Sequence, residues 1–179
     1  MTQISKPDIQ AIIGLGNPGP AYYHNRHSIG FRVVDALLDK VGGSWHDRED
    51  MSTAEVIING KKIVLIKPLT FMNASGRVIP FLIKRGIKAE NILVVHDELE
   101  QPFGKVSFKI GGSARGHNGL KSIIASCGDQ FARLRCGTGR PDEREQVSAY
   151  VLQNFSEPAS EVDRMIESAV SMIEEYLSA

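Results

Sequence analysis

The segment IIGLGNPGPAYYHNRHSIGF, residues 12–31, constrains the fold more than any other part of this chain of 179 residues. Residues 14–19 form a literal G-x-G-x-x-G, the pattern of dinucleotide-binding loops. Such loops need a helix that opens within the glycines, so that free backbone N–H groups face a pyrophosphate. Pro18 has no N–H group, and Pro20 follows it closely. The segment therefore predicts a strand, a rigid loop, and a helix that starts only near Ser28.

Two polar side chains, Asn17 and His27, lie on this loop and follow the predicted first strand. Ligands of open α/β sheets collect beyond the carboxyl ends of the strands. The layout is that of a catalytic site at the rim of a sheet. It does not favour a cofactor cradle.

Length and composition suit one soluble globular domain that spans residues 1–179, with 42% hydrophobic and 23% charged residues. No apolar run reaches the ~18 residues that a membrane helix needs. The N-terminal residues lack the basic and apolar regions of a signal peptide. Cys127 and Cys136 have no metal-like spacing, so we expect reduced thiols. Together these features predict a cytoplasmic protein.

The formal net charge is zero, but the charges are unevenly distributed along the chain. Residues 104–140 carry seven Lys or Arg and one acid, whereas residues 141–179 carry two Arg and nine acids. This asymmetry fits a surface that faces a polyanion, backed by an acidic face. Charged residues that cluster in the sequence but are scattered over the folded surface explain the asymmetry equally well.

The hydrophobic pattern predicts an α/β fold, a single domain with a twisted mixed β-sheet flanked by helices. The dipeptide Asn59-Gly60 is a strong hairpin signal between two of the strands. Predicted strands cover residues 9–15, 53–58, 61–66, 91–96, 105–110 and 133–137. Predicted helices cover residues 28–41, a short stretch after residue 75, the residues that follow a glycine-rich loop at 111–119, and residues 159–177.

Polar side chains at the ends of these elements suggest general-base chemistry. Asp97 follows the strand at 91–96 and comes within reach of His27, whose tautomer a carboxylate would fix. We expect the dipole of the following helix to keep His27 neutral. Asparagine amides suit an oxyanion or an amide-bearing substrate, and Asn73 and Asn118 join Asn17 in that role.

Structural explanations compete with each of these roles. A lone histidine before a helix is more often structural, and an aspartate after a strand is often only a turn residue. Asn73 and Asn118 are also possible helix caps. The loop GGSARGHNG lacks the ending of a phosphate-binding P-loop and is better interpreted as a mobile gate. Nearby cations suit phosphates or merely a solvated surface; they are Lys105, Lys109, Arg115, Lys121, Arg133 and Arg135.

Four segments resemble, in order, the signatures of the bacterial peptidyl-tRNA hydrolase family. They are GLGNPGPAYYHNRHSIGF, KPLTFMNASG, HDELEQPFGKVSFKIGGSARGHNGLKSI and FARLRCGTGRP. The resemblance extends from residue 12 to VLQNFS at 151–156. It implies a monomeric α/β enzyme without metal or cofactor. Such an enzyme cleaves the ester between a peptide and the 3′ end of tRNA, and so recycles tRNA from stalled or dropped-off translation.

The resemblance also assigns roles to individual residues. His27 matches the catalytic base, Asp97 the acid that supports it, and Asn17 a residue beside the scissile ester. Four residues match positions that contact the tRNA end or the peptide: Tyr22, Phe71, Asn73 and Asn118. Lys109 and Arg135 match basic positions that clamp tRNA phosphates.

The chain departs from the family pattern at two positions near the site. Ser28 stands where many members have Asn, and Arg115 stands where Gly is common. Two other functions compete with hydrolysis. One is a tRNA-binding relative without activity, and the other is an oxidoreductase that rests only on the G-x-G-x-x-G. The second needs an acid at the end of a second strand, whereas Asp35 and Asp39 fall inside the first predicted helix.

Overall fold

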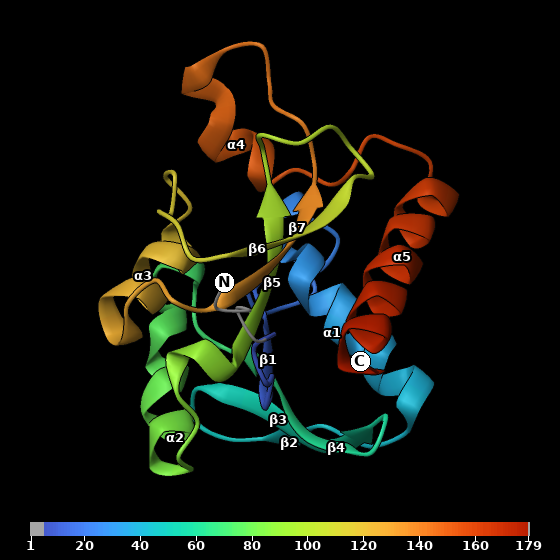
Figure 1. Ribbon diagram of the computed structural model, residues 1–179. Coiled ribbons are helices and arrows are strands. Elements are labelled where there is room, and N and C mark those ends of the chain that lie inside the picture. The colour runs from blue at the N-terminus through green and yellow to red at the C-terminus, as the bar shows by residue number, and fades with distance from the viewer. Residues whose placement is uncertain (1–5, 179) are drawn as a thin grey trace, which may run out of the picture.

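A single seven-stranded sheet forms the centre of the molecule in the computed structural model, which describes residues 6–178 (Figure 1). Its strand order is β2-β3-β4-β1-β5-β7-β6. The strands are β1 (Ala11–Gly14), β2 (His46–Asp47), β3 (Met51–Ile58), β4 (Lys61–Pro68), β5 (Ile92–Glu98), β6 (Val106–Ile110) and β7 (Ala132–Gly137). The four central strands, β4, β1, β5 and β7, run parallel, and β2, β3 and β6 pair antiparallel at the two edges.

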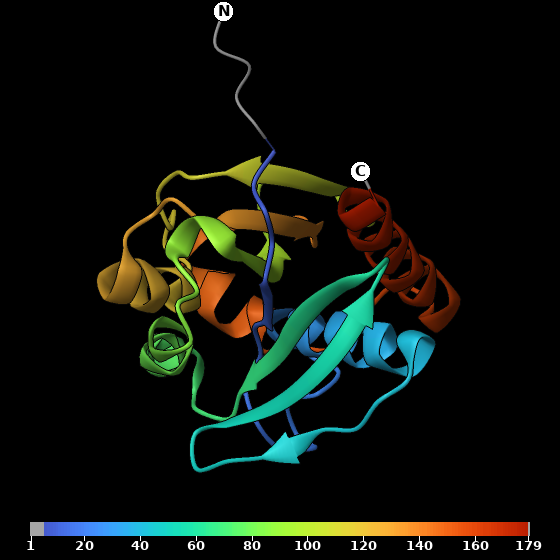
Figure 2. The same cartoon turned by 60° about the horizontal axis from the view of Figure 1, so that its bottom comes forward.

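Helices cover both faces of the sheet, so the predicted α/β class is confirmed (Figure 2). α1 (Ile29–Val41) and α5 (Ala159–Ser178) pack on one face, and α2 (Ile79–Lys84) and α3 (Asn118–Cys127) lie on the other. α4 (Val147–Val151) lies beyond the end of the sheet (Figure 1). Short 3₁₀ turns complete the chain at η1 (Arg26–Ser28), η2 (Met72–Val78), η3 (Ala89–Asn91) and η4 (Arg144–Gln146). Within residues 6–178, no helix is long and apolar enough to cross a membrane.

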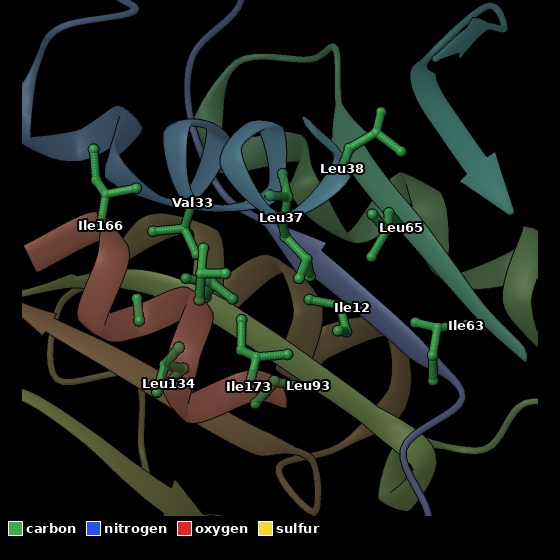
Figure 3. Close-up of a cluster of buried hydrophobic side chains, with 14 of the residues drawn as sticks. Ile12, Val33, Leu37, Leu38, Ile63, Leu65, Leu93, Leu134, Ile166 and Ile173 are labelled. Carbon is green, nitrogen blue, oxygen red and sulfur yellow. The ribbon is translucent and has the colours of Figure 1, made fainter. Parts of the chain in front are cut away.

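Alternation along the central strands divides the core into two layers. Ile12 points toward α1 and α5, where it packs with Leu37 and Ile173 (Figure 3). Its neighbours Ala11 and Ile13 point to the opposite face and pack beneath α2 and α3. Because both faces are covered, β1 (AIIG) and the first four residues of β5 (ILVV) are apolar without interruption, as parallel strands usually are.

The glycines of the G-x-G-x-x-G segment permit close packing and do not open a helix. A Cβ on Gly14 would lie 2.3 Å from the carbonyl oxygen of Gly30, where α1 crosses β1. A Cβ on Gly16 would strike the ring of Phe31. Only Gly19 has a positive φ, of 102°. The prediction of a strand and a helix-free loop is confirmed, although a single 3₁₀ turn, η1, precedes α1.

Several element boundaries differ from the prediction. The hairpin around Asn59-Gly60 is confirmed, with left-handed φ values of 50° and 80° at the two turn residues. β5 continues through Glu98, so Asp97 lies within the strand rather than after it. Neither the two-residue β2 nor α4 was predicted, because both are too short to show a periodic pattern.

Candidate active site

A cavity of about 520 Å³ opens at the carboxyl ends of the central parallel strands. Asn17 reaches it from the loop after β1, and Asp97 from the end of β5. Most of the predicted site residues line this one cavity: Asn17, His27, Phe71, Asn73, Asp97 and Asn118. Side chains 101 residues apart in sequence therefore share one surface, as expected for groups beyond the carboxyl ends of the strands in an open α/β sheet.

His27 and Asp97 form a buried hydrogen-bonded pair in the cavity. Nδ1 of His27 lies 2.9 Å from Oδ2 and 3.1 Å from Oδ1 of Asp97. His27 is 8% exposed and Asp97 is 2% exposed, so water competes little for this hydrogen bond. The η1 turn directs the imidazole toward β5. Because Nδ1–H donates to the carboxylate, the lone pair of the neutral ring is on Nε2.

The pKa of His27 is shifted in the direction opposite to the one predicted from the helix dipole. Burial favours neutral His27, but the negative charge of Asp97 and its hydrogen bond outweigh burial and raise the pKa of His27 above 6.5. The prediction that the helix dipole keeps His27 neutral is therefore wrong in direction. For Asp97, burial opposes ionisation. The contacts from His27 and His117 outweigh it and hold the pKa of Asp97 well below its usual range.

His117, which closes the glycine-rich loop, is a member of the site to which the sequence assigned no role. Its Nε2 lies 2.8 Å from Oδ1 of Asp97. It is also the N-cap of α3, where its Nδ1 accepts hydrogen bonds from the backbone N–H groups of Gly119 and Leu120. These two donors fix the tautomer, so Nε2 carries the hydrogen and donates it to Asp97. Nothing in its spacing distinguishes His117 from an ordinary loop residue.

The nitrogen and oxygen atoms of His27, Asp97 and His117 lie within 4.8 Å of one another, a grouping that could hold a metal ion. Coordination would require a lone pair on Nε2 of His117. That atom instead carries the hydrogen, because the N-terminal amides of α3 occupy Nδ1. The hydrogen bonds of the cluster thus fit proton transfer better than coordination.

Asn17 is oriented by the backbone of η2. Its Oδ1 accepts a hydrogen bond of 2.8 Å from the N–H of Met72, which leaves the Nδ2 donor for the cavity. Its own backbone N–H donates to Oγ of Ser28 at 3.1 Å. Ser28 is fully buried. The serine therefore ties the loop of Asn17 to the turn of His27, a defined role at a position where the chain departs from the family pattern.

The two other asparagines are not helix caps. Phe71 precedes η2 as its N-cap, so Asn73 is the second residue of that turn, and Asn118 is the first residue of α3 after the cap His117. Both asparagines are exposed and line the cavity. Phe71 is 62% exposed at the cavity edge and meets the ring of Tyr22 edge-on, with centroids 6.2 Å apart. Their side chains are therefore available to a ligand.

The two residues matched to the family's phosphate contacts, Lys109 and Arg135, lie on β6 and β7, outside the cavity lining. Lys109 and Arg135 are both half-buried, and Arg135 lies 3.9 Å from Glu98. Arg133 does not suit a phosphate, because its side chain is buried. It donates to the carbonyl oxygens of Gly112 and Ser113, so it anchors the glycine-rich loop.

One wall of the cavity was missed at the sequence level. It comes from the segment after β7 and from α4, and it combines apolar side chains with two arginines. The lining residues of this wall are Arg140, Arg144, Val147, Ser148, Val151 and Leu152. A five-residue helix gives no clear periodic signal, so its placement depends on tertiary packing.

Comparison with known proteins agrees with this geometry. Residues 11–179 match the family model described as Peptidyl-tRNA hydrolase. A peptidyl-tRNA hydrolase from Rubrobacter xylanophilus is 43% identical over 164 residues, which are 91% of this chain and 92% of that protein. One from Bartonella henselae is 45% identical over 152 residues, or 84% and 79% of the two chains.

A solved structure is similar over nearly the whole chain. The crystal structure of peptidyl-tRNA hydrolase from Acinetobacter baumannii superposes with a TM-score of 0.89 at 37% sequence identity. The match covers 98% of this chain and 91% of that one.

Proposed function

The chain belongs to the peptidyl-tRNA hydrolase family, and we propose that His27 is the general base with which it hydrolyses the ester between a peptide and the 3′ end of tRNA. The observation that carries this assignment is the buried hydrogen bond between His27 and Asp97 at the floor of the cavity. Water attacks the ester carbonyl directly, so no covalent enzyme intermediate forms.

The orientation of His27 supports this direction of proton transfer. Nδ1–H donates to Asp97, so Nε2 takes the proton from the attacking water. The imidazolium that forms is stabilised by the adjacent carboxylate. General-base catalysis of this kind typically contributes about 10²–10⁴-fold in rate. Because Asp97 raises the pKa of His27, the base is also stronger than a free imidazole.

Asn17 is the proposed donor to the oxyanion. The Met72 N–H occupies its Oδ1, so Nδ2 is oriented before substrate arrives. A donor that needs no reorganisation is worth about 10²–10³-fold in kcat. The same residue would help to separate blocked from free aminoacyl groups, since its amide lies beside the ester.

The remaining predicted residues are assigned to the peptide and to the tRNA of the substrate. Asn73 and Asn118 have exposed amides on opposite elements, η2 and α3, and suit the peptide backbone. The exposed ring of Phe71, with Tyr22 behind it, suits stacking on the tRNA end. Lys109 and Arg135, outside the cavity, suit phosphates of the tRNA body.

We propose further that the enzyme works as a monomer in the cytoplasm, without a cofactor. In support, one chain supplies the base, its carboxylate and the oxyanion donor. Size-exclusion chromatography with light scattering tests the monomer. A tRNA-binding relative without activity remains the second candidate, and the complete hydrogen-bonded set around Asp97 argues against it.

The deciding experiment is turnover by the purified protein in EDTA. We expect it to release tRNA from N-acetyl-aminoacyl-tRNA and to spare the unblocked aminoacyl form. His27→Ala should lose about 10²-fold or more in kcat and keep its affinity for tRNA. His24→Ala, an exposed histidine of the same loop, is the matched control and should retain activity. Near wild-type turnover by His27→Ala would exclude the assigned base.

A further inference from the structure

The charges that line the cavity do not all pair with one another. Two carboxylates beyond Asp97 line it, Glu98 and Glu100. Glu98 lies 3.9 Å from Arg135, and Glu100 accepts a 2.8 Å hydrogen bond from Arg140. Two further arginines line the same cavity, Arg115 and Arg144. Within residues 6–178, neither has a carboxylate oxygen within 4.0 Å.

Arg115 lies at the tip of a loop that is anchored on both sides. Before it, Arg133 donates to the carbonyl oxygens of Gly112 and Ser113. After it, His117 caps α3 and holds Asp97. Arg115 itself has a φ of 47°, in the left-handed region that non-glycine residues rarely adopt. The loop therefore holds an exposed cation at the cavity at some conformational cost.

Arg144 approaches the cavity from the segment between β7 and α4. It belongs to an acidic run, with Asp142, Glu143 and Glu145 around it. Of these four charged residues within the described chain, Arg144 alone lines the cavity. Arg144 is thus the one charged side chain of this run that faces the cavity. It is a second arginine without a carboxylate partner in the described part of the chain, and it lies on a different element from Arg115.

We propose that Arg115 and Arg144 each bind a phosphodiester of the single-stranded 3′ end of the tRNA, at points separate from Lys109 and Arg135. This inference rests on the proposed function. The carboxyl group of the peptide is consumed in the ester, so the anions that every substrate carries are phosphates. A duplex cannot enter a cavity of about 520 Å³, whereas a single strand can. Arginine forks suit phosphate oxygens.

The test compares three variants of Arg115 by steady-state kinetics on N-acetyl-aminoacyl-tRNA at several salt concentrations. Arg115→Asn removes the charge and tolerates the left-handed backbone. Arg115→Gly removes the charge and all strain, and Arg115→Lys keeps the charge. We expect both neutral variants to raise KM about two- to fivefold. We also expect them to reduce the slope of log kcat/KM against log salt by about 0.7, with kcat unchanged. The lysine variant should keep the wild-type slope.

Arg144→Gln should act in the same way, and the double variant should lose about 1.4 in slope if each arginine neutralises one phosphate. Lys84→Gln is the matched control, since Lys84 is an exposed residue of α2 and is not part of the cavity lining. Figure 1 shows α2 and α4 at opposite ends of the molecule. The effects should persist on an N-acetyl-aminoacyl ester of a short 3′-terminal oligonucleotide. An unchanged slope in Arg115→Asn, a loss confined to kcat, or an effect that vanishes on the short substrate would overturn the proposal. If the wild type releases no tRNA at all, the proposed function itself fails.

Discussion

His117 joins the N-terminus of α3 to the carboxylate of Asp97. Its Nδ1 accepts the backbone N–H groups of Gly119 and Leu120, and its Nε2 donates to Asp97 over 2.8 Å. Asp97 therefore receives hydrogen bonds from two histidines, one on each side of the cavity floor. The cap of α3 and the orientation of the proposed catalytic carboxylate thus depend on one imidazole.

Replacement of His117 should separate these two roles. His117→Ala loses the cap, which costs about 1 kcal/mol in the free energy of unfolding. It also frees Asp97 to shift, for a loss of about 10–100-fold in kcat. His117→Asn restores a good cap but cannot reach Asp97, so stability should return while kcat stays low. Urea unfolding and steady-state kinetics measure the two effects. Equal recovery of both by asparagine would contradict a role for Nε2.

Asp97→Asn should shift the pH profile toward acid. Asp97 raises the pKa of His27, and burial lowers it, so removal of the carboxylate leaves burial dominant. The base must be neutral to act, so the acid limb of the kcat profile should move to lower pH. The plateau should fall at least about 10²-fold, because the imidazolium loses its partner. An acid limb that stays in place would show that the limb belongs to another group.

The motifs located most of this site because they lie at the ends of strongly patterned strands. Asn17 and Asp97 follow or close apolar runs, and parallel strands bring such ends to one edge of the sheet. The fold class followed from the same alternation of strands and helices. The pattern could not show which side chains hydrogen-bond to which partners. It made Asn118 a possible cap of α3, whereas in the structure the cap is His117.

Residues of the same type also proved to have different environments. Arg133 and Arg135 are two positions apart on β7, so they point to the same face of the sheet. Arg133 is buried against the glycine-rich loop, whereas Arg135 lies near Glu98. Composition gave both the same interpretation as phosphate contacts. The strand period gives both residues the same face, and only the packed loop shows that carbonyl groups satisfy Arg133.

Ser28→Ala should loosen Asn17 without touching the catalytic pair. The variant leaves the backbone N–H of Asn17 buried without an acceptor, which costs about 1–3 kcal/mol of stability. We expect kcat to fall as the amide loses its position, while the acid limb of the pH profile stays where it is. Ser28→Thr keeps the hydroxyl and is the matched comparison. A normal kcat in Ser28→Ala would mean that Met72 alone suffices to orient Asn17.

Lys109→Ala and Arg135→Ala should weaken binding of tRNA and spare chemistry. Each removes a cation that we propose contacts the tRNA body, so KM should rise and the salt slope should fall by about 0.9 per phosphate contact. Arg133→Gln is the contrast, because its partners are carbonyl groups of the loop. It should lower stability and leave the salt slope unchanged. A reduced slope in Arg133→Gln alone would reverse these assignments.

His96 should make the folded protein sensitive to acid. It is 2% exposed, and burial followed by the neighbouring His117 lowers its pKa to about 3. The unfolded chain takes up a proton at this residue near pH 6.5, which the folded chain does not accept until about pH 3. Stability that is present above pH 6.5 is therefore lost as the pH falls through that window.

His96→Asn removes this titration. Its amide can replace Nδ1, which lies 2.8 Å from the carbonyl oxygen of Asp97. Between pH 6 and pH 4, the wild type should lose up to about 1.4 kcal/mol per pH unit more than the variant in urea-unfolding experiments. His27, whose pKa is raised, contributes with the opposite sign. Its stabilisation is full below pH 6.5 and is lost as the pH rises through its folded pKa. It is present in both proteins, so the difference between their curves isolates His96, and parallel curves would mean that His96 is already protonated in the folded state.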